Sequence, residues 1–296
     1  MRVFITGASG WIGSATVDEL LAGGHEVVGL ARSEASAAAL EAKGAQVRRG
    51  DLDDLESIRT GAAEADAVIH LANKHDWSNQ AATNKAERAA VEAIGEAMAG
   101  SNRPFLLASG VGTAPGRAYT ENDPSPNHGP DSPRGGSENL ALEYVDRGVH
   151  TICLRFSPSV HGAGDPGLIR LLVGTAREKG VSGYVDDGAS RWPAVHRSDA
   201  ARLVGLGLQK ASAGAILHAV GEEGIASREI AEAIGRGLGV PAVSIAREDA
   251  VAHFGWLGGF FGMDVPTSST LTRQLLGWTP TGPTLLEDLA TDSYFR

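Results

Sequence analysis

A glycine-rich stretch, Thr-Gly-Ala-Ser-Gly-Trp-Ile-Gly at residues 6–13, follows a short apolar run and precedes a segment with helical periodicity. In such a loop the first glycine (Gly7) permits a tight turn, the second (Gly10) lets a diphosphate approach the backbone, and the third (Gly13) packs helix on strand. Free N–H groups at the helix start then favour an anion. The stretch therefore predicts a dinucleotide-binding loop, and a merely tight turn is the weaker alternative because both flanking elements are present.

Apolar, β-rich runs alternate with helical segments along the first half of the chain. The runs cover residues 2–6, 25–31, 45–50, 65–72, 103–110 and 150–156. This alternation predicts an α/β fold, with a doubly wound, mainly parallel sheet of the Rossmann type and helices on both faces.

The pattern becomes less regular after residue 156. Helical segments are expected at 167–179, 198–211 and 227–238, and short strands at 181–185, 215–220 and 242–246. We therefore expect a dinucleotide-binding domain over residues 1–156 and a smaller substrate lobe over residues 157–296, with segments of the lobe returning to the sheet.

The stretch 111–133 is rich in proline and has no apolar periodicity, so it is expected to form a long loop. Loops of this length inside a compact domain are usually functional, and we expect a lid.

The end of the second apolar run bears on the choice of dinucleotide. An acidic residue there would bind a ribose 2′-hydroxyl, but the run ends in Ala31-Arg32-Ser33. A guanidinium with a neighbouring hydroxyl suits a 2′-phosphate, so Arg32 and Ser33 favour NADP(H) over NAD(H). The alternative is a solvated arginine in an ordinary loop.

The charge balance excludes several classes of partner. The net charge is −10, and no run of Lys or Arg occurs, which argues against nucleic-acid and membrane binding. The single cysteine, Cys153, lies in an apolar run typical of a core position. No signal-peptide pattern and no apolar run long enough to span a membrane is present, so a cytoplasmic protein that acts on a small-molecule substrate is expected.

Taken with segments further along, the glycine spacing resembles the extended and atypical branches of the short-chain dehydrogenase/reductase superfamily, including its NAD(P)-dependent epimerase/dehydratase-like members. The matching segments are Gly50-Asp51-Leu52, His70-Leu71-Ala72, Asn84, 155–162, 192–196 with Asp199, and 276–278 with Pro280. The resemblance implies cofactor contacts at Gly7, Ser9, Gly10, Trp11, Ile12, Gly13, Arg32, Ser33, Asp51, Leu52, Leu71, Ala72, Asn84, Ser109 and Gly110.

The catalytic positions depart from this resemblance. Its acid is a tyrosine four residues before a lysine, and none of the four tyrosines here is followed by lysine at that spacing. Arg134 takes the tyrosine position and Glu138 the lysine position, while the usual serine or threonine falls on Gly110, next to Ser109. We expect residues 132–136 to open a helix, so that Arg134 and Glu138 share one face, pair with each other and transfer no proton.

Other residues are then candidates for the chemistry. The catalytic candidates are His161, Tyr184 and Ser109, and the substrate-binding candidates are Trp192, Tyr119 and His196. The alternatives are structural: His161 as a hydrogen-bonding core residue, Trp192 as core of the lobe, and His196 as part of a helix start. His70 and His75 lack a third ligand, so no metal site is expected.

These observations leave three functions open. The first is an NADP(H)-dependent oxidoreductase that moves hydride to or from a small carbonyl, imine or activated alkene with a non-standard acid. The second is a catalytically silent NADP(H)-binding sensor or partner protein, and the third, weaker one is a sugar-nucleotide epimerase or dehydratase. A monomer or a homodimer is expected, the latter through the helices near 85–100 and 134–147.

Overall fold

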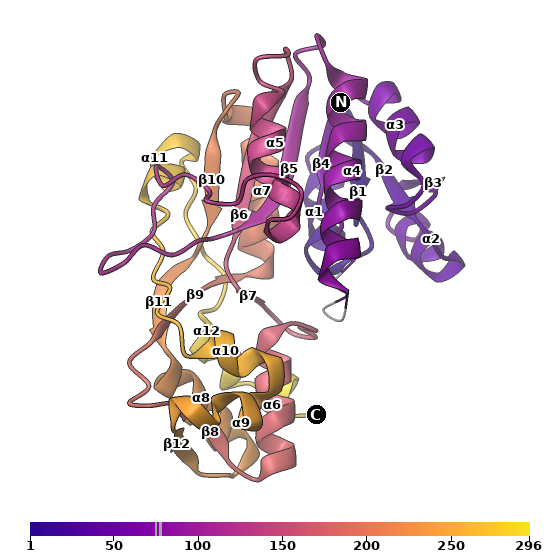
Figure 1. Ribbon diagram of the computed structural model, residues 1–296. Coiled ribbons are helices and arrows are strands. Elements are labelled where there is room, and N and C mark those ends of the chain that lie inside the picture. The colour runs from indigo at the N-terminus through magenta and orange to yellow at the C-terminus, as the bar shows by residue number, and fades with distance from the viewer. Residues whose placement is uncertain (75, 77–78) are drawn as a thin grey trace.

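The computed structural model describes residues 1–74, 76 and 79–296, and a seven-stranded sheet lies at its centre (Figure 1). The strand order is β10-β6-β5-β4-β1-β2-β3, and every neighbouring pair runs parallel. The strands are β1 (Arg2–Thr6), β2 (Glu26–Ala31), β3 (Gln46–Arg49), β4 (Ala67–His70), β5 (Pro104–Gly110), β6 (His150–Phe156) and β10 (Ile216–Ala219). The predicted parallel, doubly wound sheet is confirmed.

Helices cover both faces of this sheet because its strands are apolar on both sides. In β1, Val3 and Ile5 enter one apolar cluster, whereas Phe4 enters the other. The first cluster includes side chains of α1 (Trp11–Ala22), α2 (Glu34–Glu41) and α7 (Arg197–Lys210). The second includes those of α3 (Leu55–Glu64), α4 (Gln80–Met98) and α5 (Ser137–Glu143).

The strand order reverses between β1 and β4, which are neighbours in the sheet although two strands separate them in the chain. The chain moves outward from β1 through β2 to β3, and then from β4 in the opposite direction. Open α/β sheets bind their ligands beside the carboxyl ends of the strands at such a reversal. The glycine loop after β1 and residues 71–74 after β4 lie at this point.

The smaller lobe faces the carboxyl ends of the sheet (Figure 1). It contains a three-stranded sheet of β7 (Ser159–His161), β9 (Arg191–His196) and β11 (Glu222–Ala226), and a two-stranded sheet of β8 (Ser182–Val185) and β12 (Ala242–Ile245). Its helices are α6 (Leu168–Lys179), α8 (Ser227–Leu238), α9 (Ala250–Phe254), α10 (Gly258–Phe261) and α12 (Leu285–Leu289). The chain returns twice to the large domain after residue 157. In the first return, α7 covers one face of the large sheet and β10 forms its edge beside β6. In the second, α11 (Thr270–Leu276) packs on β10 and α7 (Figure 1).

Between β5 and residue 133 the chain has neither a helix nor a named strand, as expected. Backbone hydrogen bonds nevertheless hold the middle of this loop in place. The Tyr119 N–H donates to the Pro266 carbonyl (2.8 Å), and the Tyr119 carbonyl accepts from the Ser268 N–H (2.8 Å). The Tyr119 ring is buried and stacks on the ring of His218. Tyr119 is therefore part of the support between the loop and the lobe, and the expectation that it enters a substrate site is corrected.

Candidate functional site

The glycine loop after β1 has the shape that a dinucleotide diphosphate requires. Gly7 has a φ of +70°, and a Cβ there would lie 2.7 Å from the Ala72 N atom. A Cβ on Gly13 would lie 2.0 Å from the Gly7 carbonyl oxygen, so only glycine lets α1 approach β1 this closely. Gly10, the N-cap of α1, is exposed and offers no side-chain cap, and the first turn carries no acidic residue. The N–H groups at this helix end therefore suit a diphosphate.

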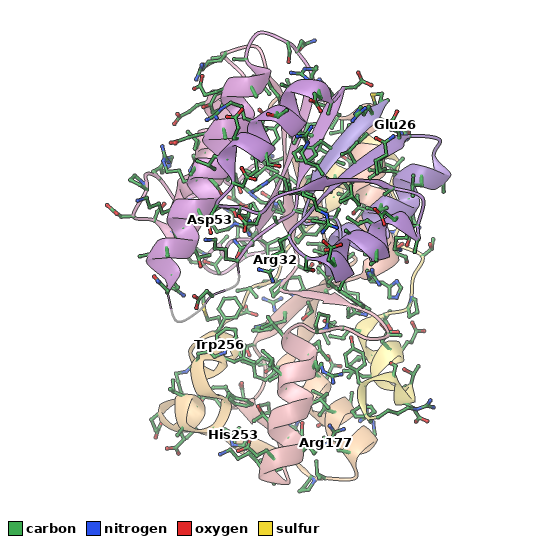
Figure 2. The ribbon with its side chains drawn as sticks, turned by 90° about the vertical axis from the view of Figure 1, so that its right-hand side faces the viewer. Glu26, Arg32, Asp53, Arg177, His253 and Trp256 are labelled. Atoms are coloured by element: carbon green, nitrogen blue, oxygen red, sulfur yellow. The ribbon has the colours of Figure 1, made fainter. Side chains whose placement is uncertain are left out.

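The predicted contacts to the adenosine end lie after β2 and β3. Arg32 is exposed, lies on the side of the large domain facing the lobe (Figure 2), and has no partner among the described residues. Ser33 is the N-cap of α2 and accepts from the Ser36 N–H (3.2 Å). Asp51 accepts from the Asp53 N–H (2.8 Å). The Arg32 guanidinium at the end of β2 is therefore available to bind an anionic group of a ligand.

Residues 133–136 do not open an α-helix in the expected way. Arg134, Gly135 and Gly136 have left-handed φ angles of 55°, 61° and 63°, and α5 begins only at Ser137. Arg134 and Glu138 consequently do not pair with each other, and that expectation is wrong. The Arg134 Nη2 donates to Glu87 Oε1 (2.6 Å).

Glu138 instead forms a buried ion pair with Arg155 of β6. The Arg155 Nη2 donates to Glu138 Oε1 at 2.6 Å, and the Arg155 Nε faces both carboxylate oxygens. Both side chains are buried. The carboxylate is thus committed to holding α5 on β6.

A chain of polar groups links the strand reversal to Arg134. The Thr6 hydroxyl lies 2.7 Å from His70 Nδ1, and His70 Nε2 lies 3.8 Å from Glu87 Oε2. The Asn73 side chain donates to the same Glu87 oxygen (3.2 Å). Glu87 is fully buried. Burial alone would raise its pKa, but Arg134 and His70 together lower it to about 2, so the carboxylate stays charged.

This ion pair predicts a specific loss of stability in acid. The pKa of Glu87 falls from its ordinary value of 4.5 to about 2 on folding, so its contribution is complete above about pH 5 and disappears as the pH falls to about 2. The shift corresponds to about 3 kcal/mol of unfolding free energy. We expect the stability difference between wild type and Arg134→Gln to shrink over this range, as measured by urea unfolding at several pH values. A difference that does not change with pH would contradict the assignment.

Two catalytic candidates lie in the small sheets of the lobe. His161 is fully buried in β7, with its Nδ1 2.6 Å from Asp288 Oδ2 and its Nε2 3.8 Å from Glu222 Oε2. Burial lowers the pKa of His161 although Asp288 opposes this. Tyr184 lies in the two-stranded sheet at the far end of the lobe (Figure 1), with the Arg228 guanidinium over its ring. Tyr184 is therefore distant from the strand reversal, whereas His161 directly follows Val160, whose carbonyl accepts a hydrogen bond from Trp11 of the glycine loop.

The two remaining substrate candidates have structural surroundings. Trp192 is buried between Phe260 and Phe261 in the core of the lobe, so the expectation that it lines a substrate site is corrected. His196 is the N-cap of α7, and its ring accepts from the Ser198 N–H (3.3 Å). This matches the structural alternative, in which His196 is part of a helix start.

Trp11, from the glycine loop, has a contact that the sequence did not indicate. Its Nε1 donates to the Val160 carbonyl of β7 (2.7 Å), and its own carbonyl accepts from Arg197 Nε (2.6 Å). The Arg197 guanidinium also lies 4.1 Å from the centre of the indole ring. The first residue of α1 thus joins the dinucleotide loop to the lobe.

A small polar cavity lies between the carboxyl end of β5 and the segment before α5. It is lined by Ser109, Ser125, Asn127, Pro133, Arg134, Gly136, Ser137 and Glu138. Asn84 of α4 supports its wall, because its Oδ1 accepts the Arg134 backbone N–H (2.9 Å). A larger hollow between α8 and α12 lies within the lobe, away from the strand reversal. Of the predicted catalytic residues, Ser109 is the one at this cavity.

Two kinds of feature are absent from the described residues. No helix among them is long and apolar enough to cross a membrane. Within the same ranges no three His, Cys, Asp or Glu side chains come together as metal ligands, and His75 lies outside the described residues. The cytoplasmic location and the oligomeric state stay predictions.

The parallel sheet, the glycine loop and the strand reversal define a dinucleotide-binding protein of the doubly wound class. Residues 3–220 match the NAD dependent epimerase/dehydratase family, and the chain belongs to that family. An uncharacterised protein of Schizosaccharomyces pombe is 47% identical over 297 residues, covering 100% of both chains. A 4-hydroxy-2-methyl-3-oxo-4-farnesyl-3,4-dihydroquinoline-1-oxide ketoreductase of Stigmatella aurantiaca is 29% identical over 200 residues, covering 64% of this chain and 58% of that one.

Solved structures share the fold. A double mutant of DesIV, a dTDP-glucose 4,6-dehydratase of Streptomyces venezuelae with NAD bound, superimposes with a TM-score of 0.77. It is 23% identical in sequence, and the match covers 100% of this chain and 97% of that one. The family description and this structure both name NAD, so the NADP(H) preference expected from Arg32 stays a prediction.

Proposed function

We propose that this protein is an NADP(H)-dependent oxidoreductase that moves hydride to or from a small carbonyl, imine or activated alkene. The observation that carries the proposal is the polar cavity between β5 and residues 133–138, beside the strand reversal. A protein that only sensed a dinucleotide would have no need of a second polar site there. The Stigmatella aurantiaca relative is a ketoreductase, which also supports a carbonyl substrate.

Separate groups of residues bind the cofactor and the substrate in this proposal. The glycine loop and the start of α1 hold the diphosphate, and Arg32 binds the 2′-phosphate. A bound nicotinamide supplies or accepts the hydride. Ser109, at the end of β5, donates a hydrogen bond to the substrate oxygen. We do not assign the role of acid to His161 or Tyr184. His161 is buried against Asp288, and Tyr184 lies in the distant two-stranded sheet.

The test is consumption of NADPH by the purified protein across a panel of small aldehydes, ketones, imines and enones. Turnover of one class supports the oxidoreductase. Binding of NADPH without turnover of any compound supports the silent sensor instead. Conversion of a nucleotide sugar without net change of the dinucleotide would favour the epimerase or dehydratase, which the family membership keeps as a second candidate.

The cofactor preference gives a separate prediction. Wild type is expected to bind NADPH more tightly than NADH, because Arg32 forms a charge-assisted hydrogen bond with the 2′-phosphate alone. Arg32→Ala should weaken NADPH binding at least about tenfold and leave NADH binding nearly unchanged. Calorimetric titration of both dinucleotides measures this, with the exposed Arg228→Ala of α8 as the control. Equal affinities in wild type would remove the preference.

A further inference from the structure

We propose that Arg134, fixed in place by Glu87, is the cation that binds the substrate's carbonyl oxygen in the cavity at the carboxyl end of β5. This assignment rests on the proposed oxidoreductase function and names the residue that takes over the missing phenol's contact with the substrate oxygen, without its role as the acid. It differs from the expectation that Arg134 only pairs with Glu138 while His161, Tyr184 or Ser109 carries the chemistry.

The cavity has the size and the polar groups of a site for a single oxygen atom. Its volume of about 10 Å³ admits the centre of one water-sized atom. Ser137, which lines it, is 1% exposed, and its hydroxyl has no partner among the described residues. The buried Nε of Arg134, another lining residue, also lacks a partner in this part of the chain. Buried donors without partners are costly, so both groups favour a ligand that accepts a hydrogen bond.

The backbone around Arg134 is held in a conformation that non-glycine residues rarely adopt. Arg134 has a φ of +55°, a strained conformation that persists only where the surroundings enforce it. Three residues of α4 enforce it here. Asn84 Oδ1 accepts the Arg134 N–H (2.9 Å), Glu87 holds the guanidinium (2.6 Å), and Arg88 Nη1 donates to the Gly135 carbonyl (3.0 Å).

The packing leaves little room for the segment to move. A Cβ on Gly135 would lie 2.5 Å from the Asn84 carbonyl oxygen, so the backbone there is in close contact with α4. A cation held this way needs no reorganisation when negative charge appears beside it, which is how preorganised donors stabilise an oxyanion.

The charges are consistent with an anion-binding role. Glu87 takes one of the five guanidinium N–H donors, and its own charge is shared with Asn73 and with His70 at longer range. The guanidinium therefore keeps unpaired donors. Since arginine does not give up its proton at neutral pH, Arg134 stabilises charge on the oxygen without acting as the acid.

In the direction of reduction, hydride adds to the carbonyl carbon and the C=O π electron pair moves onto the oxygen. Arg134, Ser137 and Ser109 bind the resulting alkoxide. A proton taken from solvent water then gives the alcohol, and the dinucleotide leaves oxidised by two electrons. The side chains of the cavity are unchanged at the end of this sequence.

The first experiment measures binding of formate, a small oxyanion, by broadening of its proton NMR signal. Wild type is expected to bind formate, and Arg134→Gln to bind it at least about tenfold more weakly. Ser137→Ala, a smaller change to the fold, should weaken binding several-fold. Arg147→Gln, which removes an exposed arginine paired with Glu96, is the control and should bind as wild type does. Circular dichroism and NADPH affinity show whether each variant is folded.

The second experiment measures turnover with a carbonyl substrate found in the panel above. Arg134→Gln should lower kcat at least about a hundredfold while NADPH affinity is unchanged, and Arg134→Lys should recover part of the loss. Formate binding that is equal in wild type and Arg134→Gln, or absent from wild type, overturns the role of Arg134 and leaves the oxidoreductase function standing. Arg134-dependent formate binding without turnover of any carbonyl supports the oxyanion site and overturns the oxidoreductase function.

Discussion

Replacing Gly13 by alanine is expected to weaken NADPH binding at least about a hundredfold and to destabilise the protein by several kcal/mol. The added Cβ would lie 2.0 Å from the carbonyl oxygen of Gly7 and 2.8 Å from its carbonyl carbon. Both are backbone atoms, so they cannot turn aside as a flexible side chain would. Helix α1 must therefore move off β1, and the N–H groups at its start move with it.

The matched control is Gly174→Ala in the middle of α6, where a Cβ would meet nothing within 4 Å. That change should raise stability by up to about 1 kcal/mol, since alanine favours the helix over glycine. Calorimetric titration with NADPH and urea unfolding measure both effects. A Gly13→Ala variant with wild-type NADPH affinity would show that the close contact of α1 and β1 is not needed for the cofactor.

The second large effect is expected from Arg155→Leu, which should lower the unfolding free energy by about 3–5 kcal/mol. The variant leaves the Glu138 carboxylate buried without the guanidinium that now lies 2.6 Å from it. It also removes the hydrogen bond from Arg155 Nη1 to the Asp123 carbonyl (2.8 Å), which fastens the loop before residue 133.

The double variant Arg155→Leu/Glu138→Leu should recover much of this loss, because no buried charge is then left unpaired. The exposed pair Arg147–Glu96 is the surface comparison, and Arg147→Gln should cost less than about 1 kcal/mol. Urea unfolding followed by circular dichroism measures all three variants. If Arg155→Leu cost no more than Arg147→Gln, the buried pair would have no structural importance.

Most of the fold could be predicted because its signals are local. The apolar run at 25–31 predicted a strand, which the structure has at Glu26–Ala31, and the helix expected at 227–238 is α8 with the same bounds. The glycine loop was recognisable because each glycine meets a requirement of the backbone. The burial of Trp192 was harder to predict, because a large aromatic residue serves equally well in a core and in a substrate site.

The partners of Arg134 and Glu138 could not be predicted from spacing. Arg134 pairs with Glu87, 47 residues away, and Glu138 with Arg155, 17 residues away. Helical spacing suggested that Arg134 and Glu138 would pair with each other, and this failed because residues 134–136 are left-handed. The dipeptide Gly135-Gly136 was the available signal, since glycine is the residue that adopts positive φ without strain. Ser137 gave no signal at all, because its importance comes from its position in a cavity.

The return of β10 to the large sheet limits how this protein can be divided. Cutting the chain near residue 157 would remove β10 and α7, and β6 would become an exposed edge with unpaired backbone groups. Grafting the lobe of another relative onto this sheet therefore needs junctions after β6, before α7, after β10 and on both sides of α11. Segments of the smaller lobe and of the large domain alternate along the chain. Recombination between relatives therefore has to exchange segments at each of these junctions rather than at a single boundary.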